Sequence, residues 1–389
     1  MCSNENKKKE KTPSYILRNV IISIIIGFAT VSVIYVFMSD KYLIEKVIIM
    51  PYWLPLIGAA LFFVVYIVDA LRTKIILKAL KEKPIKISSL INNAIQGFFF
   101  NYITPFSMGG QPYRIYDLSK NGISFIHASN AVVSRFLSQT FVTTVISIIS
   151  YITFSRIFLS LGISGSIFLI GFTIGMITSI SILIFTISKK IKKLFFKILH
   201  LKFIKKIVGL THYTSDEIEL IIDKKVYEFR DSLELLWKGN FFIMLIEATL
   251  GIFIFFIHSF ILFLFIKFLT AEGLAYPGIL EILMIHYVMG FVVYYAPTPG
   301  SSGAIEYAYY QVLSHPAFSE DRSAVLIGIT AWRISTYYIP LIIGLITVFL
   351  DKKLILKKGN KTNKDDNVIK KDDDNKNKTN ENNFIRQNN

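Results

Sequence analysis

Long apolar runs dominate this sequence and decide what it can fold into. Residues 16–38, 125–151, 164–188 and 241–269 are apolar runs that reach the roughly 20 residues with which a helix crosses a bilayer. The backbone of a membrane span must satisfy its own hydrogen bonds, so we expect helices. With 53% hydrophobic residues overall, the sequence predicts an all-α, polytopic helical membrane protein.

Lysine-rich segments between these runs orient the chain. The net charge of +16 comes mainly from lysines just outside apolar runs, which is the positive-inside pattern, so nucleic-acid binding is not expected. Segments 72–86 and 189–206 carry many basic residues and only one acid, and we expect them in the cytoplasm. Segment 270–281 has glutamates but no lysine or arginine and is expected outside. Both termini are then cytoplasmic.

Two further apolar segments are short and run into helix-breaking sequences. Proline lacks the N–H that a helix needs and clashes with the preceding turn. Both breaks contain Pro-x-x-x-Gly with a tyrosine four residues later, as Pro105, Gly109 and Tyr113 and again as Pro299, Gly303 and Tyr307. The helix-breaking residues are Pro105, Gly109, Gly110, Pro297, Pro299, Gly300 and Gly303.

The charged loops imply that both broken segments return to the side from which they enter. This gives about six full spans plus two re-entrant broken-helix hairpins, an arrangement typical of inverted-repeat transporters. Eight plain spans with proline kinks are the alternative. The expected parts are a disordered cytoplasmic N-terminus (1–15), a first membrane half (16–188, hairpin about 87–118), cytoplasmic amphipathic helices (189–239), a second membrane half (240–350, hairpin about 281–316) and a disordered cytoplasmic tail (351–389).

Charged residues near the breaks are candidates for substrate binding, because intramembrane charges are costly and usually face a partner or the bundle interior. Glu306 follows the second break. It could meet a cationic group or a proton, or simply complement the dipole of a short helix. Arg114 follows the first break. It could grip a phosphate with its planar fork, or snorkel to the interface.

Three charges fall inside full spans: Arg135, Glu247 and Arg333. Either arginine could form a purely structural ion pair with Glu247, or all three could bind a lipid head group. Tyr113 and Tyr307 complete the candidate substrate-binding set. Asp69 lies near the end of a span expected at 52–71, where interface anchoring is expected.

Templates for catalysis and metal binding do not match. Gly300-Ser301-Ser302-Gly303 is not the G-x-S-x-G elbow, and no strand precedes it. The single cysteine, Cys2, forms no internal disulfide and no zinc motif. The six histidines lack ligand spacing. We therefore expect no metal, no cofactor and no catalytic residue.

The two break motifs suggest a family. Pro297-Thr-Pro-Gly-Ser-Ser-Gly-Ala-Ile-Glu306, together with Thr104-Pro105, Gly109-Gly110-Gln111-Pro112 and Arg114, resembles the transmembrane region of lysylphosphatidylglycerol synthases and flippases, over about residues 16–350. The family pattern has an acidic residue where Gln111 stands. The resemblance implies a multi-pass plasma-membrane protein that handles a lipid. In two-domain members the membrane part translocates aminoacylated phosphatidylglycerol, and a soluble domain transfers the aminoacyl group from tRNA.

The resemblance favours a flippase-like protein that moves a phospholipid, such as aminoacylated phosphatidylglycerol, or another lipid-linked head group across the membrane. One alternative is a phosphatidylglycerol lysyltransferase using lysyl-tRNA, although no such soluble domain is expected in these residues. The other is a scaffold for envelope synthesis. The expected partners are anionic membrane lipids, with no nucleic acid apart from lysyl-tRNA in the transferase alternative. A homo-oligomer is compatible with the sequence.

Overall fold

The computed structural model describes residues 50–187, 231–294 and 298–351, with scattered positions among residues 18–48 and residues 228 and 296. Every regular element in these residues is helical. The expected segment 1–15, most of the expected cytoplasmic helices at 189–239, the tail from residue 352 and Pro297 lie outside the described residues.

Four described helices are long and apolar enough to cross a membrane. They are α3 (Trp53–Ala79), α6 (Phe125–Thr153), α12 (Phe241–Leu269) and a helix over Arg322–Asp351 that begins as α15 (Arg322–Arg333). The fold is therefore that of a helical membrane protein, while the count of six spans stays a prediction. The other long helix, α8 (Ile163–Ile187), packs against α6 and α13 (Ile279–Tyr294). The short elements are α7 (Ser155–Ser160), η2 (Leu235–Gly239) and η4 (Ile334–Tyr338).

The chain divides into two units, Met1–Ile342 and Ile343–Asn389. In the second unit, the described residues continue the last helix to Asp351. The two helical hairpins and the residues of the candidate site belong to the first unit.

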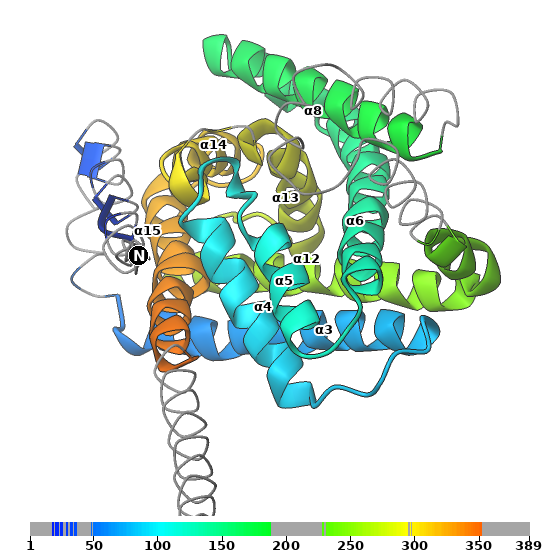
Figure 1. Ribbon diagram of the computed structural model, residues 1–389. Helices are drawn as coiled ribbons and strands as arrows, with labels where there is room; N and C mark the ends of the chain where they lie inside the picture. Colours follow the sequence, from blue (N-terminus) through cyan, green and yellow to red (C-terminus); the bar gives the residue numbers. More distant parts are fainter. Residues whose placement is uncertain are drawn as a thin grey trace, which may run out of the picture. The chain divides into compact units, whose positions relative to one another are not determined.

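Both broken segments form hairpins of short helices. The first consists of α4 (Ile87–Tyr102), η1 (Pro105–Ser107) and α5 (Gly110–Lys120), and the second of α13, η3 (Pro299–Ser301) and α14 (Ala304–Leu313). In each case the second helix packs back on the first, as α4 and α5 do in Figure 1. The segments are therefore not continuous, kinked spans. The order α3–α4–η1–α5–α6 recurs as α12–α13–η3–α14–α15, as a repeat requires, while the inverted orientation of its halves stays a prediction.

The two reversals share one backbone geometry. Phe106 and Ser107 have φ of 57° and 53°, and Gly300 and Ser301 have φ of 56° and 52°. Left-handed residues are rare outside glycine because Cβ crowds the following carbonyl. Gly300 is required for a second reason, since a Cβ there would lie 2.2 Å from the Tyr337 ring.

The reversals also meet in space. Elements η1 and η3 are in contact. The Tyr102 hydroxyl donates to the Thr336 carbonyl oxygen of η4 at 2.9 Å. The Tyr337 hydroxyl, also on η4, lies 3.4 Å from the carbonyl oxygens of both Tyr102 and Pro299 and so links the ends of the two breaks. Two breaks almost two hundred residues apart in sequence thus form one junction.

One span boundary was predicted wrongly. The span expected at 52–71 continues as α3 to Ala79, so Arg72 lies inside a helix and not in a cytoplasmic loop. The charges after Leu71 suggested an end, but glycine and proline are absent from that stretch until Pro84. A helix without a breaker continues when its charges find partners, and Arg72 is 5% exposed.

We expect Gly110→Ala to destabilise the first hairpin. A Cβ at Gly110 would lie 2.1 Å from the Gly97 carbonyl oxygen, so α5 must move away from α4. Overpacking of this kind costs about 1–3 kcal/mol. Thermal unfolding in detergent should show a lower midpoint for Gly110→Ala. Gly278→Ala is the control, because its Cβ meets nothing closer than 3.6 Å. Equal midpoints for the two variants would contradict the close approach.

Membrane orientation can be tested with single cysteines. Each cysteine is introduced into a Cys2→Ser background, and intact cells are treated with a membrane-impermeant maleimide. The reagent should label Glu272→Cys but not Lys83→Cys, because the positive-inside pattern puts the lysine-rich loop in the cytoplasm. Both positions are exposed loop residues. Permeabilised cells should label both. Labelling of Lys83→Cys in intact cells would contradict the orientation.

Candidate functional site

One buried carboxylate joins three helices at the centre of the candidate site. Asp69 on α3 accepts a hydrogen bond at Oδ2 from Arg114 of α5 and at Oδ1 from Arg135 of α6. Asp69 is 3% exposed. Both of its oxygens are thus used by guanidinium groups.

A second ion pair adds a fourth helix. Arg72, one turn after Asp69 on α3, donates from Nε to Oε1 of Glu247 on α12 at 2.7 Å. Its Nη2 donates to Oε1 of Gln139 on α6 at 3.3 Å. Arg135 also donates to the Thr73 hydroxyl at 2.7 Å. Helices α3, α5, α6 and α12 are therefore held by one polar network.

The network carries more positive than negative charge. It contains three guanidinium groups, Arg72, Arg114 and Arg135, and two carboxylates, Asp69 and Glu247. Guanidinium groups cannot lose their charge in a protein. The Nε atoms of Arg114 and Arg135 are buried without a hydrogen-bond partner. A buried excess of positive charge is costly alone, and an anion would relieve it.

Two glycines leave room for these arginines. A Cβ at Gly97 on α4 would lie 2.3 Å from Arg114 Nε, and one at Gly251 on α12 would lie 2.9 Å from Arg72 Nη2. The helices can approach closely because these positions lack side chains. The guanidinium groups are therefore held by helix packing as well as by their ion pairs.

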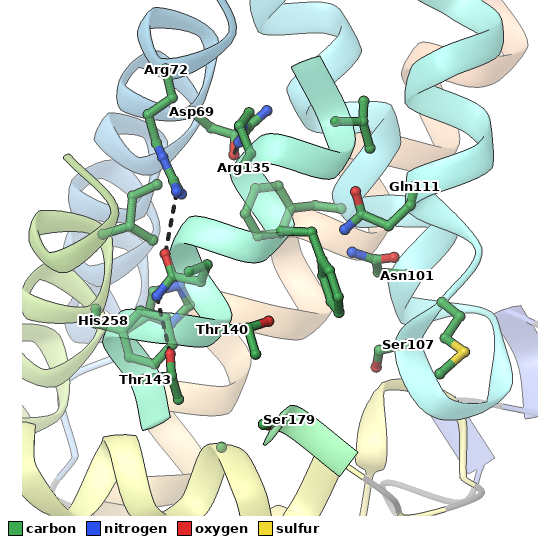
Figure 2. Close-up of a pocket in the computed structure, with 18 of the residues that line it drawn as sticks. Asp69, Arg72, Asn101, Ser107, Gln111, Arg135, Thr140, Thr143, Ser179 and His258 are labelled. Carbon is green, nitrogen blue, oxygen red and sulfur yellow. Dashed lines mark hydrogen bonds and ion pairs between the residues drawn. The ribbon is translucent and has the colours of Figure 1, made fainter. Parts of the chain in front are cut away.

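The charged network opens onto a cavity of about 430 Å³. Residues from α3, α4, η1, α5, α6, α8, α12 and α13 line it. Figure 2 shows Asp69, Arg72 and Arg135 near one end, with Asn101, Ser107 and Gln111 along one side. The rest of the wall includes apolar side chains such as Phe98, Val132 and Phe291. The site thus combines cationic, neutral polar and apolar walls inside a helix bundle.

A separate ion pair holds the second reversal. Arg333 donates from Nε to Glu306 Oε1 at 2.7 Å, and Glu306 Oε2 accepts from the Gly303 N–H at 2.7 Å. Arg333 Nη2 reaches the Gly300 carbonyl oxygen at 3.3 Å and Ser302 Oγ at 3.2 Å. Glu306 thus occupies the first turn of α14, where a carboxylate complements the helix dipole.

The predicted site residues fall into three groups. Arg114 and Arg135 line the cavity together, and Glu247 lies behind it, bound to Arg72. Glu306 and Arg333 bind each other and do not line it. Tyr113 and Tyr307 also do not line it: Tyr113 stacks on Phe100 at 4.4 Å between ring centroids, and Tyr307 is 38% exposed.

Three predicted arrangements were wrong. Glu247 pairs with Arg72 and not with Arg135 or Arg333, because Asp69 and Glu306 take those two arginines. Asp69 is not an interface anchor but the centre of the network. Arg114, which is 4% exposed, does not snorkel.

Sequence reasoning missed Asp69 and Arg72 as site residues. The predicted span 52–71 stops short of the end of α3, which places Asp69 near its edge and Arg72 in the loop beyond it. Their spacing of one helical turn was an available signal, since residues three apart share a helix face. An uninterrupted helix to Ala79 would have placed that face inside the bundle.

Comparison with known families agrees with this architecture. Residues 20–344 match the family described as the transmembrane region of lysylphosphatidylglycerol synthase. The chain belongs to this family. A search of curated proteins found no match. Membership confirms the resemblance seen in the break motifs and indicates a membrane-embedded protein with a lipid-related function.

We expect Asp69→Asn to destabilise the protein strongly, because it leaves Arg114 and Arg135 buried without their shared anion. Breaking a buried pair in this way costs about 3–5 kcal/mol, which thermal unfolding in detergent would detect. Glu234→Gln is the matched control, since the Glu234–Lys238 pair is exposed and such pairs contribute about 0–1 kcal/mol. A loss no larger than that of the control would show that Asp69 does not hold the network together.

Proposed function

We propose that this protein is a flippase-like membrane protein that moves the head group of an anionic phospholipid through the arginine-lined cavity. The observation that carries the proposal is the net positive charge of the network next to a cavity inside a membrane helix bundle. A charged head group cannot cross hydrocarbon without a polar path. Guanidinium groups bind phosphate oxygens with two parallel hydrogen bonds.

The cavity residues divide into those that bind the phosphate, one that positions them, and those that contact the rest of the lipid. Arg114 and Arg135 hold the phosphate, and Asp69 keeps their guanidinium groups in place. The apolar part of the wall accepts the first carbons of the lipid. Family membership supports the handling of a lipid.

The junction of η1 and η3 supports a moving part. Breaks in paired helices of two repeats mark the binding region of many transporters. In this chain the reversals touch each other, and η1 contributes Ser107 to the cavity wall. We propose that separation of the two hairpins opens the cavity to one side of a plasma membrane, with both termini in the cytoplasm.

Reconstituted vesicles test the function. The purified chain in liposomes should speed the movement of acyl-labelled phosphatidylglycerol between leaflets, measured by quenching of the outer leaflet. Arg114→Gln combined with Arg135→Gln should reduce the protein-dependent rate at least about tenfold, because charged hydrogen bonds of this type contribute roughly 1.5–3 kcal/mol each.

Arg156→Gln is the control for this experiment, since Arg156 is exposed and does not line the cavity. Its rate should equal that of the unaltered chain. Thermal unfolding should first establish that the double variant is folded. An unchanged rate in that folded variant would contradict the assignment of Arg114 and Arg135 to phosphate binding. A new lipid species in the vesicles or in cell extracts would instead point to a transferase.

A further inference from the structure

We infer that the cavity selects an anionic phospholipid whose head group beyond the phosphate is uncharged and rich in hydroxyls, such as glycerol or another polyol, and disfavours cationic, aminoacylated head groups. This inference rests on the proposed function and specifies its substrate. It follows from the charges that line the cavity and from how each carboxylate is used.

The charged wall of the cavity is almost entirely cationic. Among the described residues, the charged groups lining it are Arg72, Arg114, Arg135 and a single carboxylate, Asp69. His258 and His286 also line it, and an imidazole is either neutral or positive. A lysyl or other aminoacyl group would therefore bring its ammonium next to charges of the same sign, which costs several kcal/mol at a close interface.

Among the described residues, Asp69 is the carboxylate that lines the cavity, and both of its oxygens already accept from guanidinium groups. Asp69 uses one oxygen for Arg114 and the other for Arg135. Glu247 has an oxygen without a partner, but the residue is 0% exposed and does not line the cavity. Glu306 is engaged by Arg333 and by the Gly303 N–H. A cationic head group would thus meet in the cavity wall a carboxylate, Asp69, that two guanidinium groups already neutralise.

Neutral polar side chains occupy the rest of the polar wall. They are Asn101, Ser107, Gln111, Gln139, Thr140, Thr143, Thr178 and Ser179. Figure 2 shows Asn101, Ser107 and Gln111 along one side, and Thr140, Thr143 and Ser179 farther from Asp69 and Arg72. Amides and hydroxyls both donate and accept hydrogen bonds, as a polyol requires. The volume of about 430 Å³ lies within the range of small-molecule sites, about 300–1,000 Å³.

Paired lipids test the inference. Phosphatidylglycerol and lysyl-phosphatidylglycerol with the same labelled acyl chains differ only in the lysyl group. In vesicles containing the unaltered chain, the first should move between leaflets at least about tenfold faster than the second, because specificity can arise from repulsion of the wrong ligand. Equal rates, or faster movement of the lysyl lipid, would overturn the inference and leave the flippase proposal standing.

Binding provides a second measurement that does not depend on transport. A ligand that binds only the folded state raises the thermal midpoint. Short-chain phosphatidylglycerol should raise it in detergent, and short-chain lysyl-phosphatidylglycerol should raise it less. If neither lipid moves in vesicles but this difference is found, the flippase proposal fails while the selectivity stands. A larger shift with the lysyl lipid would overturn the selectivity.

A charge substitution in the wall should change the preference. Gln111→Glu adds a second carboxylate to the cavity wall, where it can pair with an ammonium, so the preference for phosphatidylglycerol over the lysyl lipid should shrink at least about threefold. Gln111→Met is the matched control: it removes the amide without adding charge, so movement of the lysyl lipid should gain nothing over the unaltered chain, whereas Gln111→Glu should speed it. An unchanged preference in Gln111→Glu would overturn the electrostatic basis of the inference.

Discussion

The shared ion pair of Asp69 with Arg114 and Arg135 is the interaction on which the rest of the site depends. Two guanidinium groups buried near each other repel, and Asp69 on α3 offsets this repulsion by accepting from Arg114 of α5 and from Arg135 of α6. Burial of such a group costs several kcal/mol for each ion unless its partners are well placed. Gly97 supplies that placement for Arg114 by leaving space on α4.

A second ion pair has a different task. Arg333 and Glu306 do not face the cavity; they hold the loop of the second reversal through Gly300, Ser302 and Gly303. The first reversal lacks a matching ion pair among the described contacts and is held instead by Asn101 Oδ1 and Thr104 Oγ1, which accept from the backbone N–H groups of Gly110 and Gly109. The two halves therefore share a backbone path but stabilise it differently, and the positive charge of the cavity comes from the first half.

This asymmetry relates the architecture to the family. Membership of the lysylphosphatidylglycerol synthase transmembrane family indicates lipid handling, but the head group is decided by a few side chains on a common scaffold, as function generally is. In this chain Gln111 is neutral and Asp69 is fully engaged. The proposed preference for an uncharged polyol head group therefore rests on the charge of the cavity wall and not on the fold.

The sequence by itself determined the helical membrane class, the family, the two breaks and the repeat, because apolar length and the Pro-x-x-x-Gly spacing are local properties. It also singled out Arg114, Arg135, Glu247, Glu306 and Arg333 as unusual charges. Only the tertiary structure decided how they pair. Partners such as Arg72 and Glu247 are 175 positions apart, and the face on which each charge emerges depends on where a helix ends and how it packs. For that reason Asp69, read from its span as an interface residue, proved to be the buried centre of the site.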